Sequence, residues 1–470
     1  MQVVRVTGPK VNLELGSHEN WGSNRLQLIT GQNGSGKSEL LGTLIDKLAV
    51  NKKYKNTVTP IVRVDGVKPH TRVIAQTFSP FTRFAPEPPD SSLADQFMRD
   101  SGRSRSYLCL GLSRATRSIG ASLSRSVLED SLFRLSEAPE AVRTTTRIMR
   151  TLHFRAGMEM YYRITPALST LIENQDLPGF LERFIGGAEY RGISRAVQNR
   201  IVREVQLSSA NEFLDLLLTT IRTVERLERS EKKLIRYMAF EDYRASSEHH
   251  IVQSLAFLRR LELLKLEACV IRSTHDGFPF DIANASSGQQ QMLCSIISLA
   301  TALRDDSLIL IDEPELSLHP KWQMMYMQHL FDLLEQFQRC HVLIATHSPL
   351  IVERGMEMRA DVIRMGSRPE FLSHSTLHHS VEETLINVFE TPLSGSSHVA
   401  NEIFEAINGG EPGKISSWVA SLEKLRSLQE IYGQAEDRDE RTLRLIADAI
   451  ELVEAMALET DAEDGQGNDE

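Results

Sequence analysis

Five short apolar runs along the chain predict buried strands. They lie at residues 26–30, 72–76, 307–312, 341–345 and 360–365, and polar or turn residues bound each of them. Apolar runs of this length are typical of strands covered on both faces of a parallel sheet. Longer segments repeat apolar residues every three or four positions, at 210–238, 254–271, 416–433 and 438–458, which predicts helices. We therefore expect an α/β protein with a large, mainly helical insertion and a helical C-terminal region.

A glycine-rich turn, GQNGSGKS, follows the first run and begins at Gly31. Its glycines let the backbone wrap closely around phosphate oxygens with N–H groups pointing inward, its lysine neutralises their charge, and its serine hydroxyl can ligate Mg²⁺. A chance match in a Gly/Ser-rich turn is the alternative, and the predicted strand before the turn and helix after it disfavour that alternative. The residues expected to hold a nucleotide are Asn33, Gly34, Ser35, Gly36, Lys37 and Ser38.

Two later runs carry polar residues at their ends. The run SLILID is followed by Glu313, so Asp312 and Glu313 are expected at the carboxyl edge of the sheet, where open α/β sheets bind ligands. One carboxylate would hold Mg²⁺ while the next polarises a water molecule. The run HVLIA leads to His347 at the same edge, and a structural histidine is the alternative for that residue taken alone.

These features occur in the order of a known family. GQNGSGKS, a strand ending in Gln76, the segment ASSGQQQ from Ala285, LILIDEP and IATHSP together resemble the head of ABC-type ATPases. The form DEPELSLHP is similar to the OLD-type and SMC-type branch more than to a transporter motor. In two positions the chain departs from the family pattern: Ala285 stands where leucine is usual, and His319 where transporters carry an aspartate.

The resemblance implies ATP and Mg²⁺ as ligands, with ATP sandwiched between two heads of a head-to-tail dimer. It implies that Ser286, Gly288 and Gln289 reach the γ-phosphate bound to the partner head. It further implies roles for residues on the other motifs. Ser38, Gln76 and Asp312 would hold the metal ion, Gln76 would also hold the attacking water, Glu313 would be the general base, and His347 would contact the γ-phosphate.

The motifs divide the chain into parts. We expect the ATPase head in two pieces, residues 1–85 and 266–370, separated by an insertion over 86–265 and followed by helices over 371–457. About 210 residues separate Gln76 from Ser286, more than a small helical subdomain requires. Residues 458–470 carry six acidic side chains among the last twelve positions, which predicts a disordered acidic tail.

The insertion contains an arginine-rich run. From Arg99 to Arg163 there are twelve arginines, no lysine and six acidic residues, in a chain whose net charge is −10. Arg143, Arg147 and Arg150 would share one helix face, which suits a phosphate backbone or an acidic partner; a solvated face balanced by carboxylates such as Glu129 is the equal alternative. Three aromatic residues either stack on bases or belong to the core: Tyr107, Phe133 and Phe154.

The composition adds limits. With 470 residues, 41% of them hydrophobic, the chain has room for several domains, and no apolar run approaches the length of a membrane helix. A cytoplasmic protein without membrane contact is expected. The four cysteines are scattered and suggest buried apolar residues, and His374, His378 and His379 suggest an exposed turn more than a metal site.

No familiar nuclease pattern follows IATHSP. An ATPase head with an insertion and no effector resembles the stand-alone ATPases of bacterial anti-phage systems, of the Septu kind first and the PARIS kind second. That resemblance implies a regulatory ATPase that forms homo-oligomers and controls a separately encoded nuclease of the HNH or Toprim type. The alternative is a repair or structural ATPase of the SMC/RecF kind that binds DNA itself through the arginine-rich run.

Overall fold

The computed structural model describes residues 3, 5–8, 11–15, 23–48, 63–65, 72–78, 84, 107–110, 122–137, 141–173, 176–187, 193–207, 210–227, 234–239, 245–275, 277–366, 370–372, 380–391, 393, 395–408, 415–434 and 439–466. Two compact units form: the first consists of Met1–Leu26 and Ser38–Ala345, the second of Gln27–Lys37 and Thr346–Glu470.

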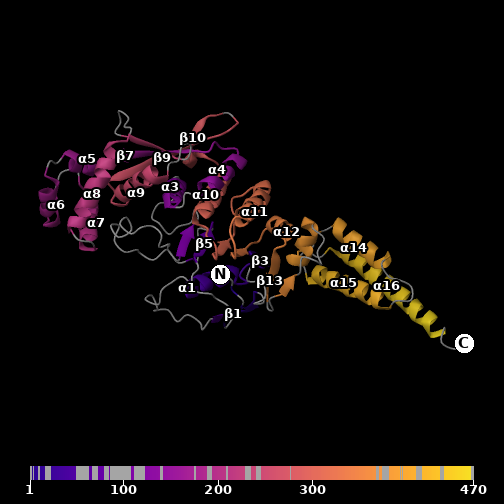
Figure 1. Ribbon diagram of the computed structural model, residues 1–470. Helices are drawn as coiled ribbons and strands as arrows, with labels where there is room; N and C mark the ends of the chain where they lie inside the picture. The colour runs from indigo at the N-terminus through magenta and orange to yellow at the C-terminus, as the bar shows by residue number, and fades with distance from the viewer. Residues whose placement is uncertain are drawn as a thin grey trace. The chain divides into compact units, whose positions relative to one another are not determined.

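A parallel sheet forms the centre of the first unit (Figure 1). Its strands lie side by side in the order β12 (His341–Ala345), β11 (Leu308–Asp312), β5 (Val73–Thr77) and β6 (Tyr107–Leu110). Every residue of these four strands is buried, as their apolar runs predict. Helix α10 (Ser287–Ala302) precedes β11 in the chain, helix α11 (Pro320–Leu334) follows it, and the two helices contact each other.

A small antiparallel sheet belongs to the same unit. It consists of β2 (Val11–Glu14), β1 (Arg5–Gly8) and β4 (Arg63–Asp65), in that order. The N-terminal segment also reaches β12, because the Val3 N–H donates a hydrogen bond to His341 Nδ1 at 3.1 Å. Burial lowers the pKa of His341 to about 3, so this histidine stays neutral and serves the fold.

The insertion is a helix-and-sheet assembly, and its sheet extends past the expected end at residue 265 to Asp281. Its antiparallel sheet has the order β10 (Pro279–Asp281), β9 (Leu264–Arg272), β7 (Met158–Ile164) and β8 (Leu234–Ala239). The helices of the insertion, shown in violet and magenta in Figure 1, are α3 (Ser122–Glu137), α4 (Ala141–Thr151), α5 (Pro166–Glu173), α6 (Leu177–Ile185), α7 (Arg195–Leu207), α8 (Ala210–Glu225) and α9 (Ala245–Arg260).

Two helices predicted here are too long. The segment 210–238 ends as a helix at Glu225 and continues as strand β8, and the segment 254–271 ends as a helix at Arg260 and continues as β9. Glu262 adopts a left-handed φ of 59°, which ends the second helix. Apolar residues in both tails satisfy a two-residue period as well as a helical one, so the pattern alone did not separate the two. The insertion is therefore mixed, and β6 within its expected range belongs to the central sheet.

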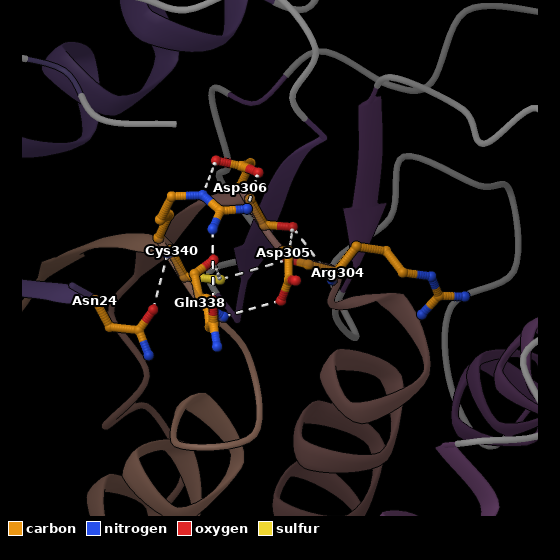
Figure 2. A network of polar contacts seen from close by, with 8 residues as sticks. Asn24, Arg304, Asp305, Asp306, Gln338 and Cys340 are labelled. Carbon is orange, nitrogen blue, oxygen red and sulfur yellow. Dashed lines mark hydrogen bonds and ion pairs between the residues drawn. The ribbon is translucent and has the colours of Figure 1, made fainter. Parts of the chain in front are cut away.

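A network of polar contacts ties together the loops that precede the strands of the central sheet (Figure 2). The Asn24 side chain accepts a hydrogen bond from the Cys340 N–H at 2.9 Å, and Asp305 accepts one from the Gln338 N–H at 2.9 Å. Arg339 binds both carboxylate oxygens of Asp306, at 2.8 and 2.7 Å. These contacts fix where β11 and β12 begin, and hence where their opposite ends lie.

The second unit combines strands with a helical bundle. Strand β13 (Asp361–Met365) pairs in parallel with β3 (Arg25–Gly31) and antiparallel with β14 (Glu370–Leu372). Short helices α12 (Pro349–Glu357), α13 (Val381–Glu383) and the π-helical η4 (Thr384–Val388) follow. Helices α14 (Ser397–Asn408), α15 (Ile415–Gln434) and α16 (Glu440–Gln466) then pack together, as the orange and yellow helices of Figure 1 show.

The expected disordered tail needs correction. Helix α16 extends to Gln466, so residues 458–466 are helical, while 467–470 lie outside the described residues. Alanine and glutamate are good helix formers, and they prolong a helix that is already anchored by Ile446 and Val453 in the core of the bundle. The acidic composition alone did not reveal this continuation.

Candidate nucleotide-binding site

The glycine-rich turn has the backbone that a phosphate cradle requires. Gly31, Gly34 and Gly36 have φ values of 139°, 83° and 95°, which side chains of L-residues rarely permit. A Cβ at Gly31 would lie 2.4 Å from the carbonyl oxygen of Met365, so a larger residue does not fit there. No atom lies within 4 Å of a Cβ built on Gly34 or Gly36, which leaves space against the turn.

Lys37 folds back onto this turn. Its Nζ donates to the carbonyl oxygens of Gly31 at 2.8 Å and Gln32 at 3.1 Å, and to Ser35 Oγ at 3.4 Å. The side chain is 5% exposed, and helix α1 (Lys37–Leu48) begins at the same residue. An ammonium group and a helix N-terminus are thus both positioned at the turn, where each favours an anion.

Ser38, the last residue of GQNGSGKS, contacts the acidic end of β11. Ser38 Oγ donates a hydrogen bond to Asp312 Oδ1 at 2.8 Å, although 274 positions separate the two residues. Asp312 is 2% exposed at the end of β11. A hydroxyl and a carboxylate oxygen are ligands that Mg²⁺ prefers, and both positions are those that the sequence predicted for the metal ion. These donors fit a magnesium ion that would neutralise nucleotide phosphates.

Glu313 adopts an unusual conformation directly beyond Asp312. Its φ is 51°, a left-handed value that costs a residue other than glycine about 1 kcal/mol. The Glu313 N–H donates to the Ala345 carbonyl oxygen at 2.9 Å, which fixes the turn at the strand end. Such conformations persist where the surrounding structure enforces them, and they cluster at functional sites.

The segment ASSGQQQ contains the cap and the first turn of α10. Ser286 caps the helix: its Oγ accepts from the Gln289 N–H at 3.3 Å, and Gln289 Oε1 accepts from the Ser286 N–H at 3.0 Å. Gly288 allows close packing, because a Cβ there would lie 3.2 Å from the Ser317 carbonyl oxygen. Ser286 is exposed, so the N-terminus of α10 is accessible to another molecule.

The structure places Gln76 away from the metal site predicted for it. Its side chain is fully buried, where Nε2 donates to the Ser295 carbonyl oxygen at 3.0 Å and Oε1 accepts from Tyr326 Oη at 2.9 Å. The parallel register aligns Gln76 with Ile311 and Thr77 with Asp312. Because successive strand residues point to opposite faces, Gln76 points away from the face that Asp312 occupies. Gln76 instead links β5 to helices α10 and α11.

We expect Gln76→Met to lower the melting temperature while leaving ATP turnover per folded molecule within about threefold of the wild type. The substitution keeps the volume but removes the side-chain hydrogen bonds of Gln76 to Ser295, Ser298 and Tyr326. It leaves the buried Tyr326 Oη without its acceptor, which costs roughly 1–3 kcal/mol. Thermal unfolding and steady-state kinetics measure the two effects. Tyr326→Phe is the matched control and should lower the melting temperature less. A large drop in turnover of Gln76→Met at unchanged stability would instead support the metal role of Gln76.

His347 lies directly after β12 and the buried Thr346, whose N–H donates to the Ile29 carbonyl oxygen at 3.1 Å. The next residue, Ser348, caps α12 by accepting from the Ile351 N–H at 3.3 Å. His347 is therefore held between an ordered strand and an ordered helix, and it is half-buried. His319, at the position of the transporter aspartate, caps α11.

Sequence reasoning missed a contact that precedes the exposed start of α10. Arg125 of α3 binds both carboxylate oxygens of Asp281, and its Nε lies 3.1 Å from Oδ1. Asp281 also caps the 3-10 helix η3 (Ile282–Asn284), which leads directly to Ser286. An aspartate before a short helical turn is a recognisable cap, whereas its arginine partner lies 156 positions away and carries no local signal.

Several predicted features lie outside the described residues: the histidines His374, His378 and His379, and the parts of the arginine-rich run at 99–106, 111–121 and 138–140. The four cysteines are free and buried, as expected. Over the described ranges, no three histidine, cysteine or acidic side chains gather as they would around a metal ion. Among these residues, no helix is both long and apolar enough to span a membrane.

Comparison with known proteins supports the ATPase assignment. Residues 121–353, just under half of the chain, match a family described as "AAA domain, putative AbiEii toxin, Type IV TA system". The match includes α10, β11 and β12, and it begins inside the insertion. The chain is thus similar to P-loop ATPases over this region, and the predicted fold class, an α/β fold with a parallel sheet, is confirmed.

Two further similarities are more limited. Protein ea59 of Escherichia phage lambda is 34% identical over 79 residues, which is 17% of this chain and 15% of that protein. The chain therefore matches less than a fifth of that relative's length. The solved structure of a metal-chelate type ABC transporter in an inward-facing conformation is 12% identical, with a TM-score of 0.29 over 83% of this chain and 90% of that one.

Proposed function

We propose that the protein is a magnesium-dependent ATPase that works as the regulatory part of a larger defence complex. The contact between Ser38 and Asp312 carries the enzymatic part of the proposal, because it brings together the hydroxyl and the carboxylate that would hold a magnesium ion. Lys37 would release its carbonyl partners and bind phosphate oxygens, and Glu313 would accept a proton from water. A bound magnesium ion would neutralise part of the phosphate charge.

Hydrolysis of radiolabelled ATP by the purified chain tests this part. Turnover should require Mg²⁺, disappear with a chelator, and fall strongly in Asp312→Asn, because an amide is a poor magnesium ligand. Tight ATP binding with no hydrolysis in any condition would leave a nucleotide sensor and remove the enzymatic claim.

The proposal includes assembly through the exposed start of α10. Ser286 and Gly288 belong to a capped helix N-terminus, which favours a phosphate brought by a second copy of the chain. Two heads would then share each ATP molecule in a head-to-tail dimer. The family resemblance suggests this arrangement, and the exposure of Ser286 is compatible with it.

We expect Ser286→Arg to abolish ATP-dependent dimerisation, because a long charged side chain would occupy the space of the partner-bound phosphate. Mass measurement in solution, with and without Mg²⁺ and ATP, detects the dimer. Thr219→Arg, on the exposed side of α8, introduces the same side chain elsewhere and should dimerise like the wild type. If Ser286→Arg still forms ATP-dependent dimers and hydrolyses ATP normally, the two heads do not share ATP through the start of α10.

The biological part concerns a separate nuclease. The matched family is described by a toxin of a toxin–antitoxin system, and a relative is a phage protein, which supports a role in conflict between phage and host. In this proposal ATP binding sets the conformation of a homo-oligomer that restrains an HNH or Toprim nuclease, and hydrolysis resets it. The purified chain should not cut DNA with Mg²⁺ or Mn²⁺. Cutting should require the protein that the adjacent gene encodes, called the neighbour-encoded protein below. DNA cleavage by the chain alone would reject this part.

A repair or structural ATPase that binds DNA is the second candidate. The exposed arginines of α4 are the observation in its favour. Purification with the neighbour-encoded protein separates the two candidates, since only the regulatory ATPase requires a stable complex with that protein.

A further inference from the structure

The arginines that the structure describes in this run fall into two groups. Members of the first group have partners within the fold: Arg125 binds Asp281, Arg134 binds Ser131 and Thr301, and Arg163 binds Glu267 at the surface. The buried carboxylate Glu129 does not balance the run, because it pairs with Arg259 of α9. Burial raises the pKa of Glu129 to about 7, despite this cation. Acidic side chains within the fold therefore balance the charge of only some of the described arginines in the run.

The other group faces solvent on α4. Ala141, Thr145, Ile148 and Met149 form the buried face of this helix, which places Arg143, Arg147 and Arg150 on the exposed face. Their spacing of four and three residues brings the three side chains together. Within the described part of the chain, no ion pair or side-chain hydrogen bond engages these three guanidinium groups. Their charge is therefore available to a ligand.

The end of α4 joins the turn between β9 and β10. The His153 N–H donates to the Arg150 carbonyl oxygen at 3.0 Å, and the Thr274 N–H donates to the His153 carbonyl oxygen at 2.8 Å. In the turn, a Cβ built on Gly277 would lie 3.6 Å from Arg155 Nη2, and Phe278 is 71% exposed. We name these exposed residues the basic strip: Arg143, Arg147, Arg150, His153, Arg155, His275 and Phe278.

We propose that the basic strip binds single-stranded nucleic acid. Guanidinium groups bind phosphate oxygens in pairs of hydrogen bonds, and a row of them follows a phosphate backbone. An exposed aromatic ring beside them stacks on an unpaired base, which a duplex does not offer. Of the three aromatic candidates from the sequence, Tyr107 and Phe154 are buried and unable to stack. The third, Phe133, is half-buried with the Arg260 guanidinium 5.5 Å from its ring centroid, so Phe278 takes this role.

The chemistry of the strip fits nucleic acid better than an acidic protein. Specific protein interfaces have an apolar centre in which several large side chains are buried. Among the residues from α3 to β10 whose side-chain burial the structure describes, Phe278 is the one large hydrophobic side chain that is exposed. One ring among six cationic or titratable side chains makes a poor apolar centre but a sufficient platform for a base.

Fluorescence anisotropy of a labelled oligothymidylate of about 20 nucleotides measures the binding in a series of salt concentrations. The triple variant Arg143→Glu, Arg147→Glu, Arg150→Glu should bind at least roughly tenfold more weakly, and the slope of log affinity against log salt should fall by about 2, since each lost phosphate contact removes about 0.7. Phe278→Ala should weaken binding by roughly tenfold at an unchanged slope, and Phe278→Trp should restore it.

The matched control is the triple variant Arg203→Glu, Arg222→Glu, Arg226→Glu, which makes the same charge change on exposed positions of α7 and α8 or just beyond. This control should bind the oligonucleotide like the wild type. If both triple variants bind it equally weakly, the net charge of the protein determines binding, and the basic strip is not the binding site. Tight duplex binding that ignores Phe278 would overturn the single-strand assignment. If the wild type binds no oligonucleotide and the Arg143, Arg147, Arg150 triple variant no longer binds the neighbour-encoded protein, the partner of the strip is an acidic protein. ATP hydrolysis without DNA should be the same in all variants, so a failure here is separable from a failure of the ATPase proposal.

Discussion

Lys37→Ala is expected to abolish ATP binding, with affinity lowered by at least ~100-fold, or about 3 kcal/mol. Lys37 supplies the ammonium group at the glycine-rich turn, where it already satisfies two carbonyl oxygens and the Ser35 hydroxyl. Without it, the phosphate charge would meet only backbone N–H groups and the start of α1. Titration calorimetry with ATP and Mg²⁺ measures the loss.

Lys47→Ala provides the control, since Lys47 is an exposed lysine in the last turn of the same helix. Its affinity for ATP should stay within about twofold of the wild type. Thermal unfolding of both variants excludes a folding defect as the cause. Wild-type affinity in a folded Lys37→Ala protein would contradict the assignment of the turn as the phosphate cradle.

The sequence predicted those parts of the site in which a few adjacent residues determine their own geometry. The turn after β3 depends on glycines at positions with positive φ, which the spacing of GQNGSGKS indicates. The cap of α10 depends on Ser286 and Gln289, three residues apart, and is a local pattern of the same kind that was not predicted. The contact between Ser38 and Asp312 followed once both motifs were placed at carboxyl ends of parallel strands.

Gln76 shows where this reasoning fails. A strand places alternate residues on opposite faces, so an error of one position exchanges the site face and the core face. The run RVIAQT is apolar enough for burial on both faces, and nothing in it indicates which side Gln76 occupies. The partners Ser295 and Tyr326, more than 200 positions away, decide the matter.

The insertion was predicted less well for a related reason. Segments such as 264–272 contain apolar residues that fit both a helix and a strand, and pairing between β7 and β9 decides in favour of the strand. The arginine-rich run likewise contains internal and exposed members that look alike in sequence. Only the position of Asp281 separates Arg125 from the exposed Arg143, Arg147 and Arg150.

Glu313→Gln is expected to bind ATP normally and to hydrolyse it at least ~100-fold more slowly, because an amide cannot accept the proton of the attacking water. The left-handed turn at Glu313 supports this role: the backbone is held by the hydrogen bond to Ala345, so glutamine should adopt the same conformation and fold as well. Single-turnover hydrolysis with bound, labelled ATP measures the chemical step separately from product release.

Glu315→Gln is the matched control, a neighbouring glutamate in the same DEPE turn. Glu315 lies near Tyr326, on the side where Gln76 is buried, and burial together with the charge of Glu315 raises the pKa of that tyrosine. Its replacement should therefore alter stability before turnover. If Glu313→Gln and Glu315→Gln hydrolyse ATP at equal rates, Glu313 is not the base, and its left-handed conformation serves only to turn the chain after β11.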